Sequence, residues 1–275
     1  MAQSDATFVG PVFVGPVPEV YDQYMVPMLF QPYALDMAAR VAALRPGAVL
    51  ETAAGSGVVT RALAPLLGPD ARYTVSDLAP PMLERAKARQ GADARIDWQV
   101  ADALALPCAD ASFDAVCCQF GVMFFPDRIK GYAEALRVLK PGAPFVFNVW
   151  DALAHNDFPA AVWEAVLDYY PDDPPDFFPK IPHGYHDAAQ IKADLAVAGF
   201  AAVTIETVTR QSHAAQARDV AVAMCQGTPL RMEIIKRDPV SLPAVTTHVA
   251  AALVARFGAG PISGKTQALV VVARG

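Results

Sequence analysis

Segments typical of strands and helices alternate along the first half of the chain, and this alternation restricts the fold more than any other feature. β-Branched and aromatic runs predict strands at 48–50, 72–76, 96–100, 113–120 and 144–149. Apolar residues at helical spacing predict helices at 33–44, 58–67, 80–90 and 130–139. Such an order favours βαβ units, and hence a parallel sheet covered by helices on both faces.

The pattern changes after residue 150. Residues 151–185 are rich in Pro, Asp and aromatic side chains. Beyond them we expect a helix at 187–198, a strand at 202–209, a helical stretch from about 215 to 257 and a last strand at 267–273. The two late strands can pair in antiparallel fashion at one edge of the sheet.

The prediction is therefore one α/β domain over residues 1–275, built on a Rossmann-like doubly wound sheet that is mostly parallel with an antiparallel edge strand. Its parts are a core at about 36–150, 187–210 and 264–275, an N-terminal lid at 1–35, and a helical cap formed by insertions 151–186 and 211–263. The lid contains a tandem repeat, Phe8–Val12 and Phe13–Val17, whose Gly and Pro favour an extended arm over an apolar surface.

Composition excludes several classes of function. With 22 basic and 28 acidic residues the net charge is −6, which argues against binding nucleic acid or an anionic membrane surface. Hydrophobic residues make up 54% of the chain, enough for a large core, but no apolar run is long enough to span a membrane. The four cysteines lack the spacing of a zinc site, so we expect no metal and a reducing, cytoplasmic setting.

Acidic residues end three successive strands beside a glycine turn. Glu51, Asp77 and Asp102 follow the first three strands, and Gly55 and Gly57 lie in the turn between the first strand and its helix. In open α/β sheets, ligands bind at this carboxyl edge. Glycine lets the backbone approach a ligand closely. The edge is therefore the candidate binding site.

A dinucleotide and a phosphate-free nucleoside fit this pattern to different degrees. Asp77 lies twenty residues after Gly57, as in the dinucleotide fingerprint, but Thr60 occupies the place of its third glycine. Glu51 would also repel a pyrophosphate at close range. The pattern thus favours a phosphate-free, positively charged nucleoside, with a nicotinamide-dependent oxidoreductase as the alternative.

Five sequence motifs occur along the chain in the same order as in a known family of enzymes. The chain resembles the class I S-adenosylmethionine-dependent methyltransferases, and most of all the small-molecule group that includes the ubiquinone- and menaquinone-biosynthesis enzymes. The motifs are Val49-Leu-Glu-Thr-Ala-Ala-Gly-Ser-Gly57, Asp77, Ala101-Asp-Ala103, Phe113-Asp-Ala115 and Leu136-Arg-Val-Leu-Lys-Pro-Gly142. One departure is Ala53, which stands where the family usually has a glycine.

The resemblance implies S-adenosylmethionine as cofactor, S-adenosylhomocysteine as product, and a role for each matching residue. Glu51 and the backbone from Ala53 to Gly57 would lie along the methionine part. Asp77 would accept hydrogen bonds from the ribose diol, and Asp102 from the adenine amino group. The remaining expected contacts are Leu78, Met82 and Ala103 at the adenine, Gln119, Phe120 and Gly121 at the methionine part, and Tyr21, Tyr24 and Phe30 in the lid.

The expected reaction is in-line methyl transfer to a small, apolar or aromatic acceptor. The cap aromatics Trp163, Tyr169, Tyr170, Phe177 and Phe178 are candidates for an acceptor pocket. A general base is required only if the acceptor loses a proton, and the sequence identifies none among its loop histidines, at 155, 183 and 186. A non-catalytic module that binds S-adenosylmethionine is a further alternative. The acceptor, the methylated atom and the oligomeric state are not indicated.

Overall fold

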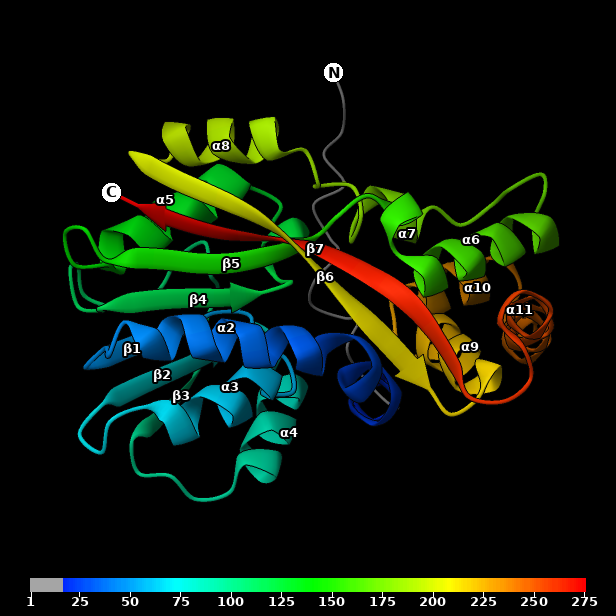
Figure 1. The fold of residues 1–275 in the computed structure, drawn as a ribbon, viewed down its shortest axis with the longest axis horizontal. Coiled ribbons are helices and arrows are strands. Elements are labelled where there is room, and N and C mark those ends of the chain that lie inside the picture. Colours follow the sequence, from blue (N-terminus) through cyan, green and yellow to red (C-terminus); the bar gives the residue numbers. More distant parts are fainter. Residues whose placement is uncertain (1–16) are drawn as a thin grey trace.

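The computed structural model describes residues 17–275, and the predicted N-terminal arm lies outside this range except for Val17, which begins a short helix. Seven strands form one sheet in the order β3-β2-β1-β4-β5-β7-β6 (Figure 1). The strands are β1 Ala48–Glu51, β2 Arg72–Asp77, β3 Ile96–Val100, β4 Ala115–Gln119, β5 Pro144–Trp150, β6 Ala202–Ala214 and β7 Ile262–Arg274. The first five pair in parallel, which confirms the predicted βαβ arrangement.

Helices cover both faces of the sheet because successive strand residues point to opposite sides. Val49, Cys117 and Val146 pack on the face that α2, α3 and α4 cover. Leu50 and Phe147 pack on the opposite face, beneath α5 and α8. The helices of the sheet region are α2 Gln31–Ala43, α3 Val58–Leu63, η2 Ala64–Leu66, α4 Pro80–Gln90, η3 Val122–Phe124, α5 Arg128–Val138 and α8 Ala188–Val197.

The two late strands form the antiparallel edge that the sequence predicts. β7 runs antiparallel to both β5 and β6, so the reversed strand lies one position in from the edge. The strands are longer than predicted, because β6 continues to Ala214 and β7 starts at Ile262. β5 pairs only with residues 268–274 of β7, so the rest of the β6–β7 ribbon projects beyond the sheet (Figure 1).

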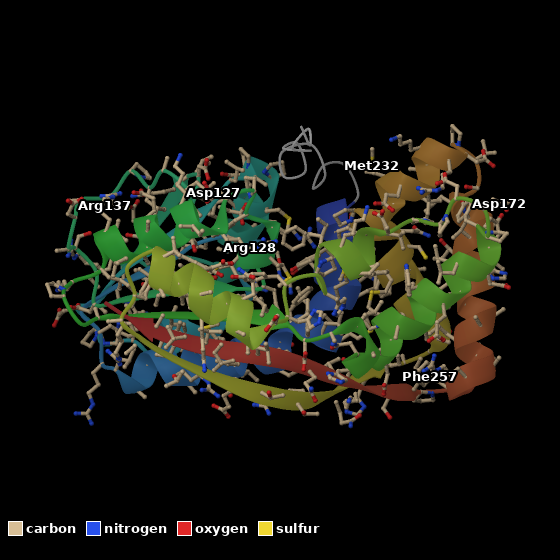
Figure 2. All side chains as sticks on the ribbon, turned by 90° about the horizontal axis from the view of Figure 1, so that it is seen from above. Asp127, Arg128, Arg137, Asp172, Met232 and Phe257 are labelled. Carbon is tan, nitrogen blue, oxygen red and sulfur yellow. The ribbon has the colours of Figure 1, made fainter. Side chains whose placement is uncertain are left out.

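The projecting ribbon carries the cap. Helices α6, α7, α9, α10 and α11 gather around its far end, at the side of the sheet opposite the C-terminus (Figure 1). Met232 on α10 and Asp172 after α6 mark the outer side of this cap, away from Arg137 on α5 (Figure 2). The cap elements are η4 Leu153–His155, α6 Asp157–Tyr169, α7 Phe177–Lys180, α9 Ala217–Gln226, α10 Leu230–Arg237 and α11 Leu242–Phe257. Within residues 17–275, no helix combines the length and apolarity needed to cross a bilayer.

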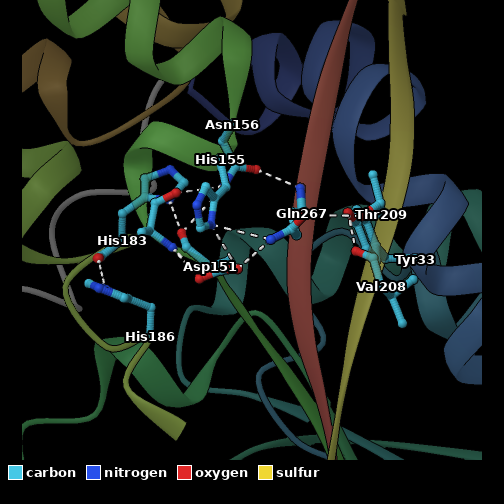
Figure 3. Close-up of polar contacts among 10 residues, drawn as sticks. Tyr33, Asp151, His155, Asn156, His183, His186, Val208, Thr209 and Gln267 are labelled. Carbon is cyan, nitrogen blue, oxygen red and sulfur yellow. Dashed lines mark hydrogen bonds and ion pairs between the residues drawn. The ribbon is translucent and has the colours of Figure 1, made fainter.

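The described N-terminal segment is helical throughout. After α1 (Val17–Val20), residues Tyr21–Phe30 form a π-helix, η1, which leads directly into α2. The Gln31 N–H donates to the Val26 carbonyl five residues back, and Pro27 lies inside the wide turns. Tyr33 on α2 donates to the Val208 carbonyl at 3.3 Å, and its hydroxyl lies 3.1 Å from Thr266 Oγ1, which ties α2 to the ribbon (Figure 3).

A substitution of Phe147 tests how much the core beneath α5 contributes to stability. The Phe147 ring is fully buried in β5 and stacks on Tyr132 at 5.4 Å between ring centroids. We expect Phe147→Ala to lower the free energy of unfolding by about 3–5 kcal/mol, because it leaves a cavity under α5. Urea denaturation measures the change. Leu66→Ala, at a side chain that is 55% exposed, is the control and is expected to stay within about 0.5 kcal/mol of the parent. Equal effects at both sites would contradict the assignment of Phe147 to the core.

Candidate functional site

One cavity lies at the carboxyl edge of the sheet, between the turn after β1, the ends of β2 and β4, the helix η1 and the cap. Twelve of the fifteen predicted contact residues line it. They are Tyr21, Phe30, Ala53, Gly55, Asp77, Leu78, Met82, Asp102, Ala103, Gln119, Phe120 and Gly121. Glu51, Gly57 and Tyr24 do not line the cavity.

The turn after β1 is held by hydrogen bonds to both neighbouring strands. The Thr52 N–H donates to the Cys117 carbonyl at 3.0 Å, and the Ala54 N–H donates to the Ser76 carbonyl at 3.0 Å. Gly55 is in the left-handed region, with φ of 57°, and so is Ala53, with φ of 52°. An alanine in this region costs roughly 1–2 kcal/mol, which explains why a glycine is usual at its position.

The loop after β4 approaches the same turn closely. A Cβ added to Gly121 would lie 2.6 Å from the Ala53 Cβ and 2.7 Å from the Cys118 Sγ. Such contacts are too short for any side chain, so only glycine fits at 121. The two backbones thus form one wall of the cavity that side chains do not obstruct.

Asp77 joins the turn to the end of β2. One carboxylate oxygen accepts from the Gly55 N–H at 2.7 Å, and the other accepts from the Ala79 N–H at 2.8 Å. Burial raises the pKa of Asp77, and the two N–H donors act against this effect. A carboxylate has about four acceptor positions, so Asp77 retains capacity for hydroxyl groups of a ligand.

The predicted adenine contacts surround the rim beside Asp77. Asp102 is exposed and accepts from the Leu104 N–H at 2.9 Å. Met82 is buried on α4, whereas Leu78 is 42% exposed. This part of the cavity therefore has the buried apolar side chain of Met82 in its wall and carboxylates at its rim.

The position of Glu51 differs from the expectation. Its carboxylate is 1% exposed and lies beneath the turn, where it accepts hydrogen bonds from the Tyr73 hydroxyl and, at 2.7 Å, from Thr60 Oγ1. Burial raises the pKa of Glu51 to about 7. This acid lies outside the cavity lining and joins β2 to α3, so it does not supply the charge on which the sequence argument against a pyrophosphate rested.

Gly57 and Tyr24 also lie outside the cavity lining. Gly57 precedes α3 with φ of 77°, and a Cβ there would lie 2.8 Å from the Ala86 Cβ on α4. It therefore permits α3 and α4 to pack closely. Tyr24 is half-buried and packs on the core of the lid.

A carboxylate that the sequence prediction missed holds η1 over the turn. The Asp22 side chain is fully buried and lies 3.0 Å from Arg89, 3.1 Å from Arg85 and 3.7 Å from Arg61. It also accepts from Ser56 Oγ in the turn at 3.1 Å. The available signal was three arginines on the two helices beside the glycine turn, with Glu84 the one acidic residue on those helices.

Aromatic side chains form the other half of the cavity. Phe120, at φ of 51°, stacks on Trp150 with 3.8 Å between ring centroids, and Phe30 lies 5.7 Å from Phe120. Phe177 and Phe178 line it as predicted. The other predicted cap aromatics do not, because they pack within the cap: Trp163 donates to the Pro175 carbonyl, Tyr170 bonds Ser241, and Tyr169 contacts His248.

Among residues 17–275, no cluster of three or more His, Cys, Asp or Glu could hold a metal ion.

Two of the three loop histidines lie outside the cavity lining. His155 is half-exposed, with Nδ1 3.0 Å from the Asp151 carboxylate, and His186 Nδ1 lies 2.7 Å from the His183 carbonyl. His183 does line the cavity and is buried. Figure 3 shows His155 and His183 bonded to Asp151, which follows β5, and His186 bonded to the His183 carbonyl.

The comparison with known families agrees with this geometry. Residues 49–142 match the family described as "Methyltransferase domain". The matched segment is 94 of the chain's 275 residues. It begins in β1 and ends after α5, so it contains the glycine turn, Asp77, Asp102 and Gly121 of the cavity.

Individual known proteins are also similar to this chain or to part of it. A demethylmenaquinone methyltransferase from Deinococcus radiodurans is 42% identical over 110 residues, which are 40% of this chain and 45% of that protein. The match thus spans about half the length of the curated relative. A phosphoethanolamine N-methyltransferase of Haemonchus contortus, solved with S-adenosylhomocysteine, covers 94% of this chain and 57% of its own, at 16% identity and a TM-score of 0.59. The [4+2]-cyclase SpnF covers 88% of this chain and 80% of its own, at 17% identity and a TM-score of 0.52, so the fold alone does not fix the reaction.

The buried acid at the end of β1 makes stability depend on pH. The native pKa of Glu51, about 7, exceeds the ordinary value of 4.5, so the folded state retains a proton that the unfolded chain releases. The free energy of unfolding therefore falls as pH rises between these values. We expect Glu51→Gln to gain on the order of 3 kcal/mol relative to the parent between about pH 4.5 and pH 8, measured by urea denaturation. Glu84→Gln, at an exposed acid, should show no such gain. A constant difference across this range for Glu51→Gln would refute the buried position of the acid.

A substitution of Asp22 tests how η1 is attached to α3 and α4. Asp22→Asn removes the charge that three arginines share, and breaking a buried ion pair costs about 3–5 kcal/mol. We expect faster amide hydrogen exchange in residues 21–30, with little change in β4 and β5. Mass spectrometry of exchanged peptides measures the effect, and Asp70→Asn, at an exposed site, is the control. Unchanged protection of η1 would show that Asp22 does not hold it.

Proposed function

We propose that the chain is an S-adenosylmethionine-dependent methyltransferase that acts on a small, apolar or aromatic acceptor by in-line transfer. The observation that carries the proposal is one continuous cavity with two chemically different halves. The first half has a backbone turn and two carboxylates, Asp77 and Asp102, and the second half is lined by aromatic rings. A nucleoside and an apolar acceptor could therefore occupy one enclosed space.

The first half suits the nucleoside of S-adenosylmethionine. Asp77 would accept from the ribose diol, since both its oxygens retain lone pairs beyond their bonds to the Gly55 and Ala79 N–H groups. Asp102, with Ala103 beside it, would accept from the adenine amino group at the rim. Leu78 and Met82 would pack on the adenine, where the cavity wall is apolar.

The methionine end would lie between the turn after β1 and the loop after β4. Gln119 supports this placement, because its amide nitrogen donates to the Phe30 carbonyl at 3.3 Å while its buried Oε1 has no hydrogen-bond partner in the described structure. A buried acceptor without a partner is costly, and an ammonium group would satisfy it. When bound, S-adenosylmethionine supplies an electrophilic methyl group on a positively charged sulfur.

The chain itself would position the acceptor and exclude water. Tyr21 stacks on Phe30 with 4.9 Å between ring centroids, and both close the cavity from η1. Phe120 and Trp150 give the acceptor half a flat, apolar wall. Alignment of two bound reactants can lower a barrier by several kcal/mol, so positioning is the main contribution that this site could make.

The acceptor class follows from the same wall. Stacked rings favour a planar aromatic acceptor, and the relative from Deinococcus radiodurans is named for demethylmenaquinone, a quinone. We therefore place a quinone-type or phenolic compound first among candidates, and leave open whether carbon, oxygen or nitrogen receives the methyl group.

A nicotinamide-dependent oxidoreductase is not favoured, because buried Thr60 replaces the third glycine of its fingerprint.

We also propose that residues 17–275 work as one catalytic domain in the cytoplasm. The apolar core on the α5 and α8 face of the sheet continues into the cap, which supports one folded unit. All four cysteines are free thiols and three of them are buried, as suits a reducing compartment.

Ligand binding tests the proposal directly. Calorimetry with S-adenosylmethionine, S-adenosylhomocysteine and NAD in parallel should show binding of the first two only. Asp77→Ala should raise the Kd for S-adenosylmethionine more than tenfold, about 1.4 kcal/mol, because the ribose loses its acceptor. Asp97→Ala, at an exposed acid on β3, is the control and should leave the Kd unchanged. Binding of NAD alone, or an unchanged Kd in folded Asp77→Ala, would refute the assignment.

A further inference from the structure

His183 is the one histidine that lines the cavity among the described residues, and it lies in the acceptor half. Its side chain is 4% exposed, and its ring centroid lies 6.2 Å from that of Trp150. Trp150 in turn stacks on Phe120 at the end of β4. The imidazole therefore lies beside the aromatic wall that Phe120 and Trp150 form.

The hydrogen bonding of His183 fixes its tautomer. Nδ1 lies 2.8 Å from the Asp151 carbonyl oxygen, which can only accept, so Nδ1 carries the hydrogen. Burial lowers the pKa of His183 to about 4, and the ring is therefore neutral near pH 7. In a neutral imidazole with hydrogen on Nδ1, the lone pair is on Nε2. No hydrogen bond to Nε2 occurs within residues 17–275.

Further hydrogen bonds hold Asp151, whose carbonyl accepts from His183, in place. The Asp151 N–H donates to the Gln267 carbonyl at 3.0 Å, and Asn156 Nδ2 donates to the Asp151 carbonyl at 3.3 Å. The Asp151 carboxylate accepts from Gln267 Nε2 at 2.6 Å and lies 3.0 Å from His155 Nδ1. These bonds join the end of β5, the start of α6 and β7 around one point (Figure 3). A network of this kind positions a ring more precisely than packing alone.

Other titratable groups that line the cavity are less suited to receive a proton from the acceptor. Asp77 and Asp102 lie in the nucleoside half. Tyr21 has its pKa raised by burial, so its hydroxyl stays protonated and cannot act as a base at neutral pH. His183 is left as the lining group with an available lone pair beside the aromatic wall.

We propose that His183 is the general base of the reaction and that Nε2 receives the proton of a hydroxyl-bearing aromatic acceptor. The proposal rests on the methyltransferase function proposed above. The acceptor atom forms a bond to the methyl carbon as the S–CH₃ bond breaks, and the electron pair of that bond stays on sulfur to give neutral S-adenosylhomocysteine. The acceptor loses its O–H proton, or the proton of a ring carbon beside the hydroxyl, to Nε2. The imidazolium then returns this proton to water.

His183→Asn is the sharpest test. The asparagine amide can keep the donor to the Asp151 carbonyl but has no basic nitrogen. His213→Asn, at an exposed histidine on β6, is the matched control. Two measurements are made on each protein: turnover of 1,4-dihydroxynaphthalene with S-adenosylmethionine, and calorimetric binding of 1-naphthol and 1-methoxynaphthalene to the protein saturated with S-adenosylhomocysteine.

For a general base we expect His183→Asn to lower kcat about 100-fold or more, with S-adenosylmethionine affinity and thermal unfolding near those of the parent. The parent should bind 1-naphthol at least tenfold more tightly than 1-methoxynaphthalene, which lacks the O–H donor, and His183→Asn should lose this preference. A kcat within threefold of the parent would overturn the proposal.

If the parent turns over no acceptor, the binding comparison decides. A hydroxyl preference that disappears in His183→Asn supports the contact, and an equal affinity for both naphthalenes in the parent overturns it. Failure of the parent to bind S-adenosylmethionine would instead reject the proposed function. The Asp77 measurements detect that failure separately from the outcome at His183.

Discussion

The cavity depends on the hydrogen bonding of one short turn. Residues 52–55 donate N–H groups to the Cys117 carbonyl on one side and to the Ser76 carbonyl and Asp77 carboxylate on the other. These bonds place bare backbone at the centre of the carboxyl edge. Gly121 can approach only because it has no side chain. Without this arrangement the two halves of the cavity would have no common wall.

The parallel part of the fold and most of the candidate site could be predicted from the sequence. Strands 48–51, 72–77 and 96–100 have clear β-branched or apolar patterns, and acids mark their ends. Side chains that follow parallel strands converge at one edge, so twelve of the fifteen contact residues line one cavity. Glu51 lies outside the cavity lining, because sequence order does not tell which way a side chain points at the end of a strand. Its contact with the methionine part stays a prediction.

The rest depends on tertiary contacts that local patterns do not encode. Residues 210–213 are polar and yet form a strand, because β7 pairs with them along their whole length. Helix α6 was missed since Pro159 and the neighbouring Asp and aromatic residues suggest a loop, but its apolar side packs on the cap. Asp22 was missed for the same reason, because its three arginine partners lie 39, 63 and 67 positions away in the sequence. Neither local propensity nor spacing predicts such partners.

The β6–β7 ribbon has a mechanical consequence. Both strands have thirteen residues, and one uninterrupted ladder joins Ala202 and Arg274 at the sheet to Ala214 and Ile262 under the cap. A bend between sheet and cap would break several ladder hydrogen bonds at once. The η1 helix, by contrast, is held to α3 and α4 mainly through one carboxylate. Main-chain pairing therefore places the cap wall of the cavity, whereas side-chain contacts to the sheet, to α3 and α4 and to the cap place the N-terminal wall.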